Sequence, residues 1–170
     1  MKIISGNVVK EAISNHILQS REWLVICTYS TDISPVEYYH FMNLIENGVR
    51  IELITGKKPD AKVISNLTKL FNIALHFSEN LHSKIYINES SVIVTSCNFG
   101  RLNIQKYHET GVYFEKSDYP KQYKEEESEV RQLLQGADLI IPMLPFKPAH
   151  TIDLRTFLFE KEGEGRRRKI

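Results

Sequence analysis

Short apolar runs that alternate with helical periodicity constrain the fold of this chain most strongly. Residues 23–27, 49–55 and 72–77 are apolar runs of strand length. The segments between them, 34–47 and 61–70, space their apolar residues as a helix with one buried face does. A strand–helix–strand unit folds with a right-handed crossover, and its two strands are then parallel. The order therefore predicts a parallel core sheet with helices packed against it.

The second half of the chain has a different character. Residues 82–88 alternate in side-chain type, and a tight turn at Glu89-Ser90 leads into the apolar run 91–95, which predicts a hairpin. Residues 109–115 predict a further strand, and 119–135 a strongly charged helix.

With a further helix over 7–19, these elements predict an α/β fold that has a mixed, largely parallel central sheet flanked by helices on both faces. We expect one domain over 1–146 and a C-terminal extension over 147–170. The extension ends in Arg166-Arg167-Arg168-Lys169, and we expect this basic end to be mobile.

Charge and cysteine content bound the classes of function. The chain has 22 Lys and Arg against 21 Asp and Glu, which excludes a polycation but leaves room for a local basic groove. Two cysteines, Cys27 and Cys97, are too few for a disulfide scaffold and lack metal-ligand spacing, so we expect buried, reduced thiols in a cytoplasmic protein. The apolar runs are far shorter than the ~20 residues that cross a bilayer, so no membrane span is expected.

A histidine and a lysine on the first hairpin strand, His82 and Lys84, are the candidate chemical centre. The His-x-Lys pattern alone arises easily by chance in a chain with 6 histidines. Its continuation is more specific, because the hairpin returns into Thr95-Ser96-Cys97-Asn98 and the next strand begins at Glu109. This series resembles the signature of the phospholipase D superfamily, in which His-x-Lys is followed after four residues by Asp, and later by Gly-Ser-x-Asn.

The resemblance covers residues 5–135 and includes Cys27-Thr-Tyr-Ser, which looks like part of the small single-motif nucleases of that superfamily. Two residues depart from the pattern: Glu89 stands where the family has Asp, and Thr95 where it has Gly. The resemblance implies that the acidic residue points away from the phosphate and has a structural role, so Glu89 leaves the chemistry intact. We expect the Thr95 side chain to restrict the pocket floor. The hairpin is also one residue shorter than the family's usual spacing.

The resemblance implies cleavage of a phosphodiester bond without a metal ion or another cofactor. A neutral His82 imidazole attacks phosphorus and forms a phosphohistidine. Lys84, on the same side of the strand, neutralises a non-bridging oxygen, and Ser96 and Asn98 donate hydrogen bonds to the phosphoryl oxygens. Glu109 accepts the proton on the other ring nitrogen of His82 and fixes its tautomer.

The leaving oxygen also needs an acid, and one chain contains a single His-x-Lys pattern. The remaining histidines stand alone, at positions 16, 40, 76, 108 and 150. We therefore expect a homodimer in which the two copies of His82 face each other across a twofold axis, as in the single-motif relatives that the sequence resembles.

Nucleic acid is the expected partner, DNA in preference to RNA, because the chain shows neither an apolar lid nor an amphipathic membrane helix. Cationic candidates for contacts with its backbone are Lys57, Lys58, Arg101 and Lys106. A separate recognition subunit or domain could act beside this one. Two alternatives stay open: a lipid phosphodiesterase, and a module that binds nucleic acid or protein without turnover. Within the motif region we expect Cys97 to be a packed thiol and His108 to be exposed.

Overall fold

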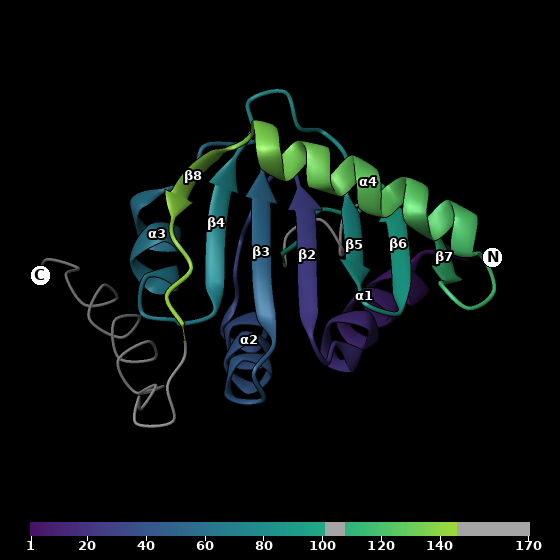
Figure 1. Ribbon diagram of the computed structural model, residues 1–170, viewed down its shortest axis with the longest axis horizontal. Coiled ribbons are helices and arrows are strands. Elements are labelled where there is room, and N and C mark those ends of the chain that lie inside the picture. The colour runs from purple at the N-terminus through teal and green to yellow at the C-terminus, as the bar shows by residue number, and fades with distance from the viewer. Residues whose placement is uncertain (101–107, 146–170) are drawn as a thin grey trace, which may run out of the picture.

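The computed structural model describes residues 1–100 and 108–145, which form one eight-stranded sheet with four helices (Figure 1). Two of the candidate cations, Arg101 and Lys106, and the extension 147–170 lie outside the described residues. In chain order the elements are β1 (Lys2–Ser5), α1 (Asn7–Gln19), β2 (Trp23–Thr28), α2 (Pro35–Glu46), β3 (Arg50–Thr55), α3 (Ala61–Leu67), β4 (Ile73–Phe77), β5 (Ile85–Asn88), β6 (Ser91–Thr95), β7 (Thr110–Glu115), α4 (Pro120–Gly136) and β8 (Asp138–Ile141).

The sheet is mixed, as predicted, but the expectation that it is largely parallel is wrong. Its strand order is β1-β7-β6-β5-β2-β3-β4-β8. Among the described strands, β2–β3 and β3–β4 are the parallel pairs, and every other neighbouring pair is antiparallel. The parallel pairs belong to the predicted strand–helix–strand core, where helical crossovers return the chain to the same edge. Tight turns and direct connections reverse the chain elsewhere.

Helices cover both faces of the sheet, which confirms that part of the prediction. One core cluster contains Tyr38 and Phe41 of α2, packed with α1 and with Leu67 of α3 against the sheet. The other contains Tyr123 and Val130 of α4, packed against the opposite face. In Figure 1, α4 crosses the near face of the strands, while α1 and α2 lie behind them.

The start of α2 is fixed by its sequence. Ser34 and Glu37 form a capping box, in which the Glu37 carboxylate accepts from the Ser34 backbone N–H at 2.9 Å, and Pro35 occupies the first turn. This cap sets where the loop after β2 ends. At the other end, Gly48 has a φ of 83°, a conformation that suits glycine.

Several strand ends converge on one edge of the sheet. Because β5 and β7 are antiparallel to their neighbours, their amino ends lie beside the carboxyl ends of β2, β3 and β6 (Figure 1). The segments that carry the candidate residues follow or precede these ends. None of the helices in residues 1–100 and 108–145 has the length and apolar character needed to cross a bilayer.

Candidate active site

His82 and Lys84 lie just before β5, at the edge where these strand ends meet. His82 is exposed, whereas the Lys84 side chain is mostly buried, with a residue exposure of 7%. The Lys84 ammonium lies 3.2 Å from His82 Nδ1 and donates to the His82 carbonyl oxygen at 2.7 Å. Since an ammonium has only donors, this contact makes Nδ1 an acceptor and leaves the ring proton on Nε2.

The charge of Lys84 is placed in a partly desolvated setting. Burial lowers the pKa of its ammonium, and the Glu109 carboxylate opposes this shift by raising it. A partly buried cation has fewer competing waters, so its attraction for an anionic oxygen is stronger than that of a solvated lysine.

Ser96 and Glu109 bring the end of β6 and the start of β7 together. The Ser96 hydroxyl donates to the buried Glu109 carboxylate and accepts from the Thr110 N–H at 3.1 Å. The Ser96 N–H donates to the Thr110 carbonyl oxygen at 2.9 Å. Within the described residues, the hydrogen-bond partner of the Glu109 carboxylate is therefore Ser96, and the contact between Glu109 and His82 stays a prediction.

Asn98 is held by the end of β2. Its side-chain oxygen lies 3.2 Å from the Thr28 hydroxyl and accepts from the backbone N–H groups of Tyr29 and Ser30 at 3.0 and 3.4 Å. The Thr28 hydroxyl also accepts from the Phe99 N–H at 2.9 Å. Because these donors use the oxygen, the amide nitrogen of Asn98 is the group left to donate to a ligand.

Tyr29 is a neighbour of the site, and no role was predicted for it. Its ring centroid lies 5.3 Å from that of His82, and its carbonyl oxygen accepts from the Lys57 N–H at 2.6 Å. Lys57 and Lys58 are both exposed, so the loop after β3 presents two cations near the candidate histidine. Thr28 and Tyr29 both belong to the series Cys27-Thr-Tyr-Ser. The resemblance of that series to the superfamily is the feature of the sequence that points to these two residues.

A glycine allows this close approach. A Cβ atom on Gly56 would lie 1.9 Å from the Leu81 carbonyl oxygen, so no larger residue fits between the end of β3 and the segment that leads into His82. The position of His82 beside Tyr29 therefore depends on Gly56.

The departure at Thr95 is accommodated locally. Its hydroxyl donates to the Thr110 carbonyl oxygen at 2.6 Å and accepts from the Cys97 N–H at 3.2 Å. Across the strand pair, a Cβ atom on Gly111 would lie 2.8 Å from Thr95 Cβ, so the absence of a side chain on Gly111 makes room for the threonine.

The expected structural role of Glu89 is confirmed. This residue lies beyond the far end of β5, and its carboxylate accepts from the backbone N–H groups of Arg21, Glu22 and Trp23 at 2.9, 3.3 and 3.3 Å. It ties the turn of the hairpin to the start of β2, away from His82.

The readings of Cys97 and His108 are also confirmed. Cys97 is fully buried and free, and burial raises the pKa of its thiol to about 11, with a further rise from Glu109. A thiol with such a pKa is a packed group rather than a nucleophile at neutral pH. His108 is exposed.

Comparison with known proteins extends the pattern beyond these residues. The sequence model described as "Cardiolipin synthase, PLD-like domain" matches residues 13–131. The sequence has no match among curated proteins.

Solved structures share the fold at low identity. Nuc from Salmonella typhimurium, a phospholipase D family member, has a TM-score of 0.67 at 15% identity, covering 83% of this chain and 99% of that one. NucT from Helicobacter pylori has a TM-score of 0.62 at 13% identity, covering 82% and 100%. TrmBL2, an archaeal chromatin protein with a novel mode of DNA binding, has a TM-score of 0.57 at 12% identity, covering 82% and 54%.

Proposed function

This chain belongs to the phospholipase D superfamily, and we propose that it hydrolyses phosphodiester bonds of nucleic acid through a covalent intermediate on His82. The observation that carries the proposal is the pairing of an exposed imidazole with the partly buried Lys84 ammonium, 3.2 Å from Nδ1. Near this pair, the amide nitrogen of Asn98 has no acceptor within the part of the chain that the structure describes. These groups supply a nucleophile, a cation and a hydrogen-bond donor for one phosphate.

The first step requires a change of tautomer. For Nε2 to attack phosphorus, the ring proton must sit on Nδ1, where Lys84 now donates. We expect an entering phosphate to draw the Lys84 ammonium onto a non-bridging oxygen, which frees Nδ1 to carry the proton toward Glu109. Ser96 already donates to that carboxylate, and this stabilises its ionised form.

Hydrolysis then proceeds in two successive displacements at phosphorus. The Nε2–P bond forms as the bond from phosphorus to the leaving oxygen breaks, and the leaving oxygen takes a proton from an acid. A water molecule next attacks phosphorus and gives a proton to that same group, and the N–P bond breaks to release His82.

His82 of a second copy is the proposed acid. The first copy is exposed at the sheet edge, so a twofold dimer can bring two such rings to one phosphate. Light scattering is expected to give about twice the chain mass, and activity is expected to fall on dilution as the dimer dissociates. An active species that stays monomeric at all concentrations would rule out the paired-histidine step.

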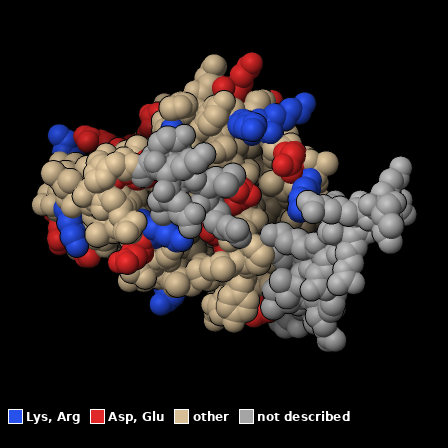
Figure 2. Space-filling view, turned by 180° about the vertical axis from the view of Figure 1, so that it is seen from behind, with Lys and Arg blue, Asp and Glu red and all other residues tan. Residues whose placement is uncertain are grey.

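Nucleic acid is proposed as substrate, with DNA preferred, on two observations. Lys57 and Lys58 are exposed in a loop whose backbone bonds to Tyr29, the neighbour of His82, so they are available to contact a phosphate backbone. TrmBL2, which shares the fold, binds DNA. On the face that carries α1 to α3, acidic and basic side chains are interspersed (Figure 2), so we place the backbone contacts at the edge near His82.

A binding module without turnover is the second candidate. The observation that favours it is Thr95, whose side chain stands where the family has none. The experiment is incubation of plasmid DNA, RNA, a chromogenic phosphodiester and phospholipid vesicles with the protein in excess chelator. Cleavage that persists in chelator and is lost in His82→Ala supports the enzyme, and His108→Ala is the matched control because His108 is an exposed histidine outside the proposed set. Binding of DNA without cleavage supports the module, and cleavage of vesicle lipid alone assigns a lipid substrate.

A further inference from the structure

A cavity between α1 and α2 opens beside the candidate active site. It encloses about 140 Å³, and its polar lining includes Lys10 and Ser14 of α1, His40 of α2, and Asn98. Apolar side chains complete the walls, among them Ile13, Ile17 and Val36. The mixture of apolar walls and a few converging polar groups is typical of a small-molecule site.

The cavity shares Asn98 with the groups proposed to bind phosphate. Asn98 is one of the residues that line the cavity, and its side-chain oxygen is held by the end of β2. Tyr86 of β5, which also lines the cavity, follows Lys84 by two residues. Lys10 is near the motif as well, because its charge opposes the rise in the pKa of Cys97.

The cavity size limits what it holds. An apolar protein cavity of about 150 Å³ binds one benzene molecule, so a cavity of about 140 Å³ matches a single six-membered ring better than a fused two-ring system. The substituent next to a scissile phosphate in nucleic acid is a nucleoside, and a pyrimidine is a base with one ring.

The polar groups select the same ring. Glu37, the acidic residue of the lining, is already engaged by the N–H and hydroxyl of Ser34 in the capping box. The Tyr86 hydroxyl donates to the Cys97 carbonyl oxygen at 3.1 Å. The remaining groups are a cation, a hydroxyl and an imidazole, from Lys10, Ser14 and His40, and they can donate to the carbonyl oxygens of a pyrimidine. A cationic lipid headgroup would be repelled by Lys10.

We infer that this cavity is the base subsite of the enzyme and that it takes the pyrimidine of a nucleotide adjoining the scissile phosphate. The inference rests on the proposed function, because it names the class of nucleotide for which that site is built. Lys10, Ser14 and His40 are then specificity-determining residues.

The test measures binding and cleavage separately. Binding of single-stranded oligonucleotides with a pyrimidine, a purine or an abasic residue throughout is measured by fluorescence anisotropy on the His82→Ala protein. Cleavage of the same three oligonucleotides is measured on the protein with His82 intact. We expect both affinity and kcat/KM to favour the pyrimidine about tenfold or more over the purine, as differences in pocket fit commonly do.

A cavity-filling variant links this preference to the site. Ser14→Phe places a ring in the cavity and is expected to reduce the ratio of pyrimidine to abasic binding to about one. Ser65→Phe, the same substitution at an exposed position of α3, is the matched control and should keep the ratio. Circular dichroism checks whether both variants fold. If Ser14→Phe does not fold, His40→Ala provides a second, smaller change to the lining of the cavity.

The outcomes separate the two proposals. Pyrimidine-selective binding without any cleavage supports the subsite and contradicts the proposed hydrolysis. Cleavage with equal binding and equal rates for pyrimidine and purine supports hydrolysis and overturns the subsite. A pyrimidine preference that survives both Ser14→Phe and His40→Ala also overturns it.

Discussion

The two ends of β5 carry similar residue types in opposite settings. At its amino end are His82, Lys84 and, across from them, Asn98. At its carboxyl end lie Asn88, its last residue, and His16 of α1, both within the protein interior. His82 is exposed, whereas His16 is 1% exposed. The contrast shows how burial separates a group that can react from one that only holds the fold.

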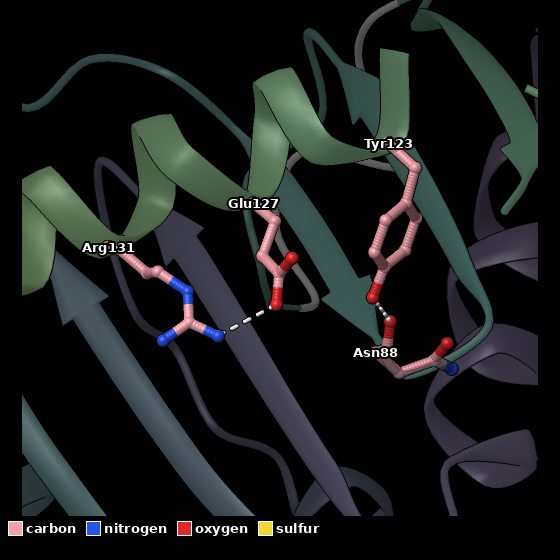
Figure 3. A network of polar contacts seen from close by, with 4 residues as sticks. All are labelled: Asn88, Tyr123, Glu127 and Arg131. Atoms are coloured by element: carbon pink, nitrogen blue, oxygen red, sulfur yellow. Dashed lines mark hydrogen bonds and ion pairs between the residues drawn. The ribbon is translucent and has the colours of Figure 1, made fainter. Parts of the chain in front are cut away.

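At the buried end, both polar groups of the Asn88 side chain are used in internal hydrogen bonds. The Asn88 side-chain oxygen accepts from the N–H groups of Ser90 and Ser91 at 3.0 and 2.9 Å, and its amide donates to the His16 carbonyl oxygen at 3.2 Å. Tyr123 of α4 donates to the Asn88 carbonyl oxygen at 2.6 Å (Figure 3). At the exposed end, the amide nitrogen of Asn98 has no acceptor among residues 1–100 and 108–145 and can donate to a ligand.

The largest expected effect is on activity at the exposed end. Lys84→Met removes the cation while keeping the apolar stem, and kcat/KM is expected to fall ~10²–10³-fold, as for loss of one transition-state donor. Stability is expected to stay the same or rise, because burial disfavours the ammonium. Steady-state kinetics measures kcat/KM and urea unfolding measures stability. Lys62→Met, at an exposed position of α3, is the control. Unchanged kinetics would contradict the role of Lys84.

The two asparagines sharpen the comparison directly. Asn88→Ala leaves several buried partners unsatisfied and is expected to cost about 2–4 kcal/mol of unfolding free energy with normal activity in the folded fraction. Asn98→Ala is expected to abolish most activity at a cost of about 1 kcal/mol. Equal losses of stability in the two variants would break the proposed distinction.

The buried histidine predicts a pH dependence of stability. Burial lowers the pKa of His16 to about 4, and Glu89 opposes the shift. Since the unfolded chain has the ordinary value near 6.5, stability is full above that pH and is lost as pH falls from 6.5 toward 4, by up to about 3 kcal/mol. His16→Gln should remove this component, as seen in the difference between the two proteins' unfolding free energies across that range. Parallel pH curves would show that His16 titrates normally in the fold.

The smallest effects are expected on α4. Tyr123→Phe loses the bond to the Asn88 carbonyl oxygen and should cost about 1 kcal/mol. Arg131→Gln breaks the pair with Glu127 at 2.8 Å (Figure 3), but the pair lies one helical turn apart with the arginine exposed, so no measurable change in thermal midpoint is expected. A larger loss for Arg131→Gln than for Tyr123→Phe would reverse our ranking of buried and exposed contacts.

Sequence periodicity was sufficient for the central strands but not for the edges. The runs that became β2, β3 and β4 are buried on both faces, and their helical crossovers imply parallel pairing. The short strands β1 and β8 have mostly exposed residues, and β1 pairs with β7 more than a hundred residues away. A local sequence pattern indicates which residues of a strand are buried, but not which distant strand it pairs with. For this reason the antiparallel direction of most strand pairs was not predicted.

The candidate site was predictable in its members and less so in its contacts. The sequence predicts that His82 and Lys84 share a strand face; β5 begins only at Ile85, but the two residues still lie together just before it. The donors that hold Asn98 come from Thr28, Tyr29 and Ser30, about seventy residues earlier. The link from Ser96 to Glu109 likewise depends on strand pairing between β6 and β7, which no spacing rule supplies.

The account depends on a bond between phosphorus and the ring of His82, and direct detection of that bond is its most direct test. The protein is mixed with a pyrimidine oligonucleotide in chelator, quenched at alkaline pH within its first turnover, digested, and examined by mass spectrometry. We predict a nucleotide adduct on the peptide that contains His82, absent from His82→Ala. Turnover with the adduct on another residue, or with no adduct under conditions where the first displacement outpaces the second, would contradict the account.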